Sequence, residues 1–503
     1  MGSWRPCSLG GVVCGANINS QIRTLTRETS VLVADGLRAM STHWLRRVVW
    51  VTAVLATGYL VGSEVANGRA SLLIAGVVLL GVIAVVVARP EVALMVWFTA
   101  ILADGRWLTY QKVGPLYVTE PLLALLIFGV TVRLLFPAGG NASGPRQKPA
   151  RFLLLIFLAM FIPATIGLAL RTSAYDYATA RNCVLILYLL FAVITVAITD
   201  LGRSYKGWFI VAVAGPAIAL LIVATGNAGP AEATSTGAVR IAAHTFALAF
   251  GVAPIVLIAA AREKMIRPLY AVLGSAPFLV ALVFVNHRSA WLAFIAATGI
   301  LFARRMSPPI IVGGFAIIVC GLILLSVTGS STPVLTEEIE RAKTLTSTDD
   351  PNAKFRLRFW GAALTRSIDS PLIGAGFDAY PSEIIPPTTV AEDPFPAPHN
   401  SFVAIAYRIG FIPFLLVMAL LLHLVIQGIR VSGVRRDPRD RATCTALTAV
   451  VVYAGITSAF NVFLEAPYAG PLFWSAVGLL AYSVYGRPFE IGADRSPARR
   501  DAS

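Results

Sequence analysis

A histidine and an asparagine stand where a polar, proline-rich stretch meets a long apolar run, in PFPAPHNSFVAIAYRIG (394–410). His399 and Asn400 therefore precede the first turn of a predicted helix, and Asn400 is predicted to cap it. The positive end of the helix dipole disfavours an imidazolium ion. We therefore expect an uncharged imidazole at His399, which can accept a proton near neutral pH.

A second ionisable side chain begins another apolar run, in VNHRSAWLAF (285–294). Arg288 lies at the start of the predicted helix, where a positive charge opposes the helix dipole. This placement is favourable if an anion is held there by the helix N-terminus and the guanidinium group together. The alternative is an arginine whose side chain extends to lipid head groups. The sequence leaves both interpretations open.

A helix is predicted over DDPNAKFRLRFWGAALTRSIDSP (349–371), because an aspartate and a proline open the segment and a second proline closes it. Arg356 and Trp360 are four residues apart and share a face of this helix. Arg358 is separated from Arg356 by roughly 200° around the helix axis. At most one of these two arginines can therefore point into a common site.

The segment PLIGAGFDAY (371–380) follows this helix. Gly374 and Gly376 permit a tight turn there, because glycine adopts backbone conformations closed to other residues. The motif is a weak match to a phosphate-binding loop, since no Lys-Ser/Thr pair follows it and no βαβ pattern surrounds it. We therefore predict a turn whose ligand-binding role depends on its neighbours.

Long apolar runs dominate the chain. Of its 503 residues, 57% are hydrophobic and 13% are charged, and the mean hydropathy is +0.75; a soluble domain has about 25% charged residues. Since a membrane-crossing helix needs roughly 20 apolar residues, we predict an all-α polytopic membrane protein with about 12–14 transmembrane helices and one large, partly helical extracytoplasmic loop. The predicted spans are 48–62, 71–88, 91–103, 117–136, 152–170, 182–199, 208–225, 241–261, 269–286, 289–303, 309–327, 402–430, 442–460 and 469–485.

The basic residues gather in alternate connectors between these spans. A net charge of +15 would favour nucleic-acid binding in a soluble protein, but here the charges follow the positive-inside rule, and we expect a lipid bilayer and no nucleic acid as partner. Both termini are predicted to be cytoplasmic in a multi-pass protein of the cytoplasmic (inner) membrane. The predicted parts are a cytoplasmic tail (1–47), transmembrane helices 1–11 (48–327), an extracytoplasmic loop (328–400), transmembrane helices 12–14 (401–486) and a second cytoplasmic tail (487–503).

The cysteines do not indicate a disulfide framework. They are Cys7, Cys14, Cys183, Cys320 and Cys444. Their number is odd, their spacings fit no metal site, and none lies in 328–400. We expect neither a disulfide framework nor a metal, and no cofactor.

Three motifs fall on one predicted side of the membrane: RSAWL from Arg288, RLRFW with PLIGAG in the outer loop, and His399-Asn400 followed after nine residues by Gly410. Together, in a protein of many spans with one large loop late in the chain, they resemble the O-antigen ligase/polymerase superfamily, membrane glycosyltransferases of the WaaL and Wzy type. The chain differs from the ligase pattern at Pro413. Ligase, polymerase and protein O-oligosaccharyltransferase therefore all remain open.

The resemblance implies a glycan donor carried on a polyprenyl diphosphate at the outer face of the membrane, and a glycan or glycolipid acceptor. Arg288 and Arg356 would bind the diphosphate and neutralise its developing charge without a metal ion. His399 would take the proton of the acceptor hydroxyl. Arg408 lies about two and a half turns further along the helix, on another face. The residues expected to bind substrate are Asn400, Arg358, Trp360, Gly374, Gly376 and Arg408.

Two other classes of protein remain as alternatives. A transporter, such as a flippase for lipid-linked oligosaccharides, also has many spans, but its outer loops are short and its two halves are related. A peptidoglycan-type glycan polymerase would use an aspartate of the outer loop, for which Asp369 and Asp378 are the candidates. The sequence specifies neither the sugar nor the oligomeric state.

Overall fold

The computed structural model describes residues 89–104, 112–113, 116–117, 119–135, 147–172, 177–199, 201–225, 246–285, 287–302, 351–378, 380–381, 383 and 398–486. These residues are almost entirely helical, which confirms the all-α prediction. The exception is a small hairpin, in which β1 (Lys112–Val113) pairs antiparallel with β2 (Leu116–Tyr117). The predicted spans 48–62, 71–88 and 309–327 and both predicted tails lie outside the described residues.

The helices follow the apolar runs of the sequence. They are α3 (Pro90–Asp104), α4 (Thr119–Leu135), α5 (Gln147–Arg171), α6 (Tyr177–Leu187), α7 (Leu190–Ile198), α8 (Leu201–Ala224), α9 (Phe246–Arg262), α10 (Pro268–Phe284), α11 (Arg288–Phe302), α14 (Pro351–Asp369), α15 (Ser401–Ile409), α16 (Phe411–Val434), α17 (Pro438–Ser458) and α18 (Ala469–Tyr485).

Three stretches of the described residues are long and apolar enough to cross a membrane: Lys148–Arg171 in α5, Ser204–Ala224 in α8 and Phe411–Val434 in α16. Large apolar side chains remain exposed on each of them, for example Leu155 at 58% and Leu422 at 60%. Such surfaces are costly in water but stable against lipid chains. The protein is therefore a polytopic membrane protein.

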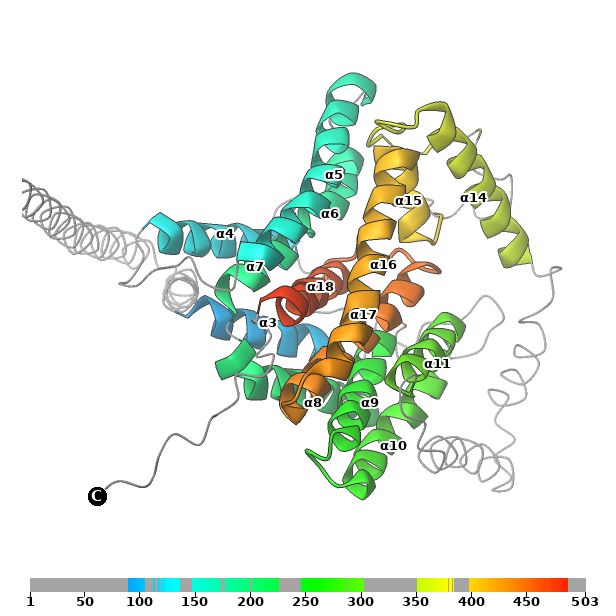
Figure 1. Ribbon diagram of the computed structural model, residues 1–503. Helices are drawn as coiled ribbons and strands as arrows, with labels where there is room; N and C mark the ends of the chain where they lie inside the picture. The colour runs from blue at the N-terminus through cyan, green and yellow to red at the C-terminus, as the bar shows by residue number, and fades with distance from the viewer. Residues whose placement is uncertain are drawn as a thin grey trace, which may run out of the picture. The chain divides into compact units, whose positions relative to one another are not determined.

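Helices α17 and α18 lie at the centre of the packing (Figure 1). Helix α17 packs against α9, α11, α16 and α18, and α18 also packs against α7 and α5. Helix α17 is largely buried from Ala442 onward, and α18 is largely buried along its whole length. The side chains of Tyr453 on α17 and Trp474 on α18 are fully buried. This core fixes the position of the loop that joins the two helices, 459–468.

Two of the predicted spans each contain two helices with a break between them. The run 402–430 breaks at Gly410, whose φ of +98° is readily adopted only by glycine. The backbone there approaches Pro371 so closely that a Cβ on Gly410 would lie 2.6 Å from the Pro371 carbonyl oxygen. The run 182–199 likewise divides into α6 and α7. Neither break is visible in the hydropathy of the sequence, because apolar residues lie on both sides of it.

Helix α14 confirms the helix predicted over 349–371 and lies beside α15 (Figure 1). Phe359 and Ala363 on α14 are fully buried against Val403 and Tyr407 on α15. These four side chains form a small core, separate from the core of the membrane helices. Helix α14 is thereby fixed against the segment that carries His399.

Candidate functional site

His399 immediately precedes the cap of α15. Its φ of +48° is unusual for a residue with a side chain, and the side chain is half-buried. The Asn400 side-chain oxygen Oδ1 accepts hydrogen bonds from the backbone N–H groups of Phe402 (3.0 Å) and Val403 (3.1 Å). Asn400 thus caps α15 as the sequence predicted, and the cap fixes the backbone from which His399 projects.

The loop 459–468 braces the same end of α15. The Ser401 backbone N–H donates to the Asn461 carbonyl oxygen at 3.2 Å. The Ser401 hydroxyl donates to Glu465 Oε2 at 2.7 Å and accepts from the Leu464 N–H at 3.0 Å. A carboxylate is therefore held at the N-terminal end of α15, where the helix dipole stabilises negative charge.

The loop also connects this end of α15 to the start of α11. His287 Nε2 lies 3.0 Å from Asn461 Oδ1, and the Asn461 amide nitrogen donates to the Ser289 hydroxyl at 3.0 Å. Arg288, the first residue of α11, lies between these two partners in the chain. Asn461 thus binds both the backbone at Ser401 and the side chains that flank Arg288, so the segments with Arg288 and His399 meet at one loop.

The third predicted segment reaches the same place through Trp360. The indole N–H of Trp360 on α14 donates to the carbonyl oxygen of Pro398 at 2.5 Å, directly before His399. Its ring also contacts Phe460 in the loop 459–468. Arg356 lies one turn before Trp360 and is half-buried, whereas Arg358 is exposed. The predicted difference between the faces of these two arginines is in agreement with their burial.

Gly374 and Gly376 form the turn that follows α14, with φ of +64° and +90°. The Ala375 N–H between them donates to the Tyr407 carbonyl oxygen at 2.7 Å, so this turn packs against the last turn of α15. A Cβ on Gly374 would lie 2.5 Å from that same oxygen. Both glycines therefore allow close backbone packing, which is a sufficient reason for their presence.

Arg408 holds the same turn from inside. Its side chain is 3% exposed, and one guanidinium nitrogen donates to the carbonyl oxygen of Asp378 at 3.1 Å. The guanidinium carbon also lies 4.8 Å from the centre of the Tyr380 ring. Burial raises the pKa of Tyr380, with Arg408 opposing the shift, so the ring is neutral and the contact is a cation–π interaction. These contacts make Arg408 a positioning residue.

Gly374→Ala is expected to destabilise the protein by about 2–4 kcal/mol, because alanine is strained at positive φ and its Cβ meets the α15 backbone. The matched control is Gly361→Ala on the exposed face of α14, where a Cβ meets nothing within 4 Å. That change should stabilise α14 by about 0.5–1 kcal/mol. Thermal unfolding in detergent measures both, and equal melting temperatures would contradict the packing role of Gly374.

Asn400→Ala is expected to cost about 1 kcal/mol of stability through loss of the cap, while Asn400→Ser retains a capping oxygen and the stability. The pair separates capping from substrate binding. If capping is the whole role of Asn400, the serine variant keeps both its melting temperature and its activity. A stable serine variant without activity would show instead that the asparagine amide contacts substrate.

The residues of the three motifs stand out in the sequence, but the loop that joins their segments does not. Asn461, Glu465 and Ser401 were not singled out, although NVFLE (461–465) is a polar interruption between two apolar runs, on the same predicted side as His399. His423 is an ionisable residue within an apolar run. It lies on an exposed face of α16, beside Phe152. It takes no part in the site.

Membrane-type helices, with a cluster of polar residues at the loop between α17 and α18, define a class, the all-α polytopic membrane proteins. Residues 269–418 match the family model described as O-antigen ligase. This match supports a resemblance to the O-antigen ligase/polymerase superfamily over that segment of the chain. A comparison with curated proteins found no match. The matched range contains Arg288, Arg356 and His399.

Proposed function

We propose that the protein is a glycosyltransferase that transfers or polymerises a glycan from a polyprenyl-diphosphate-linked donor at the outer face of the cytoplasmic membrane. The match of residues 269–418 to the O-antigen ligase model supports a glycan-ligating or glycan-polymerising activity in general. The observation that carries the finer proposal is the meeting of three segments at one loop. Asn461 binds His287 and Ser401, and Trp360 binds Pro398.

In the proposed reaction, an acceptor hydroxyl attacks the anomeric carbon of the donor sugar. The new glycosidic bond forms as the bond from the anomeric carbon to the diphosphate oxygen breaks. His399 takes the hydroxyl proton, and the polyprenyl diphosphate leaves with the bonding electron pair. Arg288 and Arg356 bind the diphosphate and stabilise the charge that develops on it. His399 thus acts on the acceptor hydroxyl, and the two arginines act on the leaving diphosphate.

The surrounding residues give this reaction its geometry. Asn400 and Ser401 hold the backbone on either side of the α15 start, and Trp360 holds the carbonyl before His399. Arg408 and the two glycines fix the turn that leads from α14 to the α15 end. Precise placement of this kind contributes to rate, because a displacement of about 1 Å can cost a hundredfold. Arg358, on the exposed face, would reach only the outer parts of a glycan.

The proposed function is tested by deleting the gene and analysing surface and lipid-linked glycans. Loss of the attached polymer with retention of the lipid-linked polymer indicates a ligase, and accumulation of single lipid-linked repeat units indicates a polymerase. Unchanged glycans with altered uptake of a solute would contradict the proposal and favour a transporter.

EDTA is expected to leave the transfer rate of the purified protein unchanged. In the proposed mechanism two guanidinium groups, rather than a metal ion, neutralise the charge of the diphosphate. The measurement is transfer of a polyprenyl-diphosphate-linked glycan in proteoliposomes with and without chelator. Inhibition that Mg²⁺ or Mn²⁺ reverses would refute the metal-independent mechanism.

A further inference from the structure

We propose that the protein binds an anionic phospholipid at the end of α16 and α17 opposite to the candidate site. The connector 435–437 joins these helices, and α17 then runs from Pro438 to Ser458 before the loop that contains Asn461. A helix of 21 residues is about 30 Å long. The lipid would therefore belong to the leaflet remote from His399, and this site does not depend on the proposed function.

An apolar cavity lies between α3, α8, α9, α17 and α18, with a volume of about 130 Å³. Its walls are mainly aliphatic and aromatic, among them Phe98, Trp208 and Ala446. The indole N–H of Trp208 is buried, and no acceptor for it lies within the described part of the chain. Apolar cavities of this order of size take up hydrocarbon molecules rather than water. The cavity therefore suits part of an acyl chain.

A second, polar cavity of about 70 Å³ adjoins the first. Three residues line both cavities: Leu201 and Tyr205 on α8 and Thr443 on α17. The polar cavity is otherwise lined by residues of the connector, of the first turn of α17 and of the end of α18, including Arg435 and Arg439. An apolar space and a charged space thus share a wall at one end of the membrane helices, which is the arrangement that an acyl chain and its head group need.

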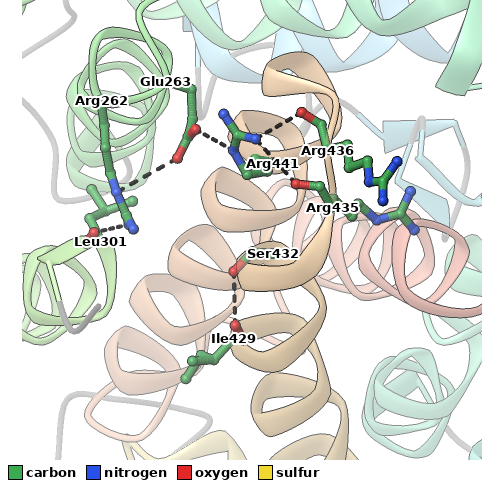
Figure 2. A network of polar contacts seen from close by, with 8 residues as sticks. All are labelled: Arg262, Glu263, Leu301, Ile429, Ser432, Arg435, Arg436 and Arg441. Carbon is green, nitrogen blue, oxygen red and sulfur yellow. Dashed lines mark hydrogen bonds and ion pairs between the residues drawn. The ribbon is translucent and has the colours of Figure 1, made fainter. Parts of the chain in front are cut away.

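The carboxylates of this region already have partners. Asp437 accepts from the Arg439 backbone N–H at 2.9 Å as the cap of α17, and Asp440 lies 3.2 Å from an Arg435 nitrogen. Figure 2 shows the Arg441 guanidinium between Glu263, at 2.5 Å, and the carbonyl oxygens of Arg435 and Arg436. These contacts hold the connector in place. Asp437 keeps its negative charge, but Arg435, Arg436, Arg439 and Arg441 outnumber the carboxylates Asp437, Asp440 and Glu263, so the region is net positive.

Two guanidinium groups keep capacity for an anion. Arg439 lies with its guanidinium carbon 5.4 Å from the centre of the Tyr205 ring, and among the described residues no carboxylate lies within 4 Å of it. The Nε atom of Arg435 is buried and has no acceptor in the described ranges. A phosphate oxygen is the acceptor that guanidinium groups bind best. Charge therefore selects an anionic head group.

A phospholipid explains both cavities, whereas a soluble anion explains only the polar one. The arginines stand at the ends of membrane helices, at the depth of the lipid head groups, where basic residues attract anionic lipids. The phenol of Tyr205 lines both cavities and the indole of Trp208 lines the apolar one, and such side chains favour this depth. Phosphatidylglycerol is a suitable probe because it carries one net negative charge.

The test is native mass spectrometry of the full-length protein with added phosphatidylglycerol. Arg439→Gln is expected to weaken binding of one lipid molecule roughly tenfold, since a hydrogen bond to a charged group is lost. Arg436→Gln is the matched control, because it removes the same charge three residues away, and Arg436 does not line the cavity. It should bind within twofold of the unchanged protein. Ala446→Leu, which fills part of the apolar cavity, should also weaken binding.

Three results would overturn the proposal. Equal weakening by Arg439→Gln and Arg436→Gln would indicate general attraction of anionic lipid to a basic connector. Equal affinity for phosphatidylethanolamine would refute selection by charge. Glycerol phosphate binding as tightly as phosphatidylglycerol would show that the apolar cavity has no part in binding. An increase in the melting temperature on adding phosphatidylglycerol, absent in Arg439→Gln, would support the site independently.

Discussion

His399→Asn is expected to lower the rate of glycan transfer by a factor of about 10²–10⁴, the usual contribution of a general base. Asparagine is the informative replacement because the φ of His399 is +48°, a conformation in which asparagine is common and alanine is strained. The variant should keep its melting temperature and lose activity. Transfer of a radiolabelled lipid-linked glycan to acceptor in proteoliposomes measures the effect.

The matched control is His423→Asn on the exposed face of α16, which removes an imidazole outside the site. Its rate should stay within twofold of the unchanged protein. An unimpaired His399→Asn variant would refute the role of His399 as the base. A second informative variant is His399→Ala, which should lose both activity and about 1 kcal/mol of stability from its backbone strain.

Arg356→Lys is expected to reduce transfer by at least tenfold, and Arg358→Lys by less than twofold. Lysine keeps the charge but loses the two parallel donors with which arginine binds a diphosphate. Arg356 is half-buried on the face of α14 that also carries Trp360, which bonds to Pro398, while Arg358 is exposed. The steady-state rate and KM for the lipid-linked donor measure the difference.

The comparison controls for charge, since the two substitutions are chemically identical and lie two residues apart on one helix. If both variants keep full activity, Arg356 does not bind the diphosphate. If both lose activity equally, α14 does not present one face to the substrate, and the contrast in burial has no functional meaning.

Much of the fold could be predicted because long apolar runs are sufficient to indicate membrane-type helices. The end signals of α14 were also local, since a proline opens the helix and another follows it. The breaks within 402–430 and 182–199 could not be found in this way. Gly410 breaks its run because the backbone must pass close to Pro371, and a contact between distant segments leaves no trace in hydropathy.

The sequence draws attention to single residues of the candidate site, but it does not show which segments come together to form the site. His399, Arg288 and Arg356 attracted attention because charged or titratable groups beside apolar runs are costly. The loop 459–468 holds the segments together through Asn461 and Ser401, yet its polar residues look like any short connector. Likewise Arg408 resembled a ligand-binding arginine in the sequence, and only its bonds to the carbonyl oxygens of Gly376 and Asp378 reveal its role in positioning the turn.

Helix α15 is clamped at both ends: Ser401 bonds to Asn461, and the backbone at Gly410 rests against Pro371. Adding or deleting a single residue between the clamps would turn one end by about 100° and shift it by about 1.5 Å relative to the other. Homologous chains should therefore keep the length of this helix constant. An insertion anywhere in 401–409 would be rarer than one in the polar stretch before it.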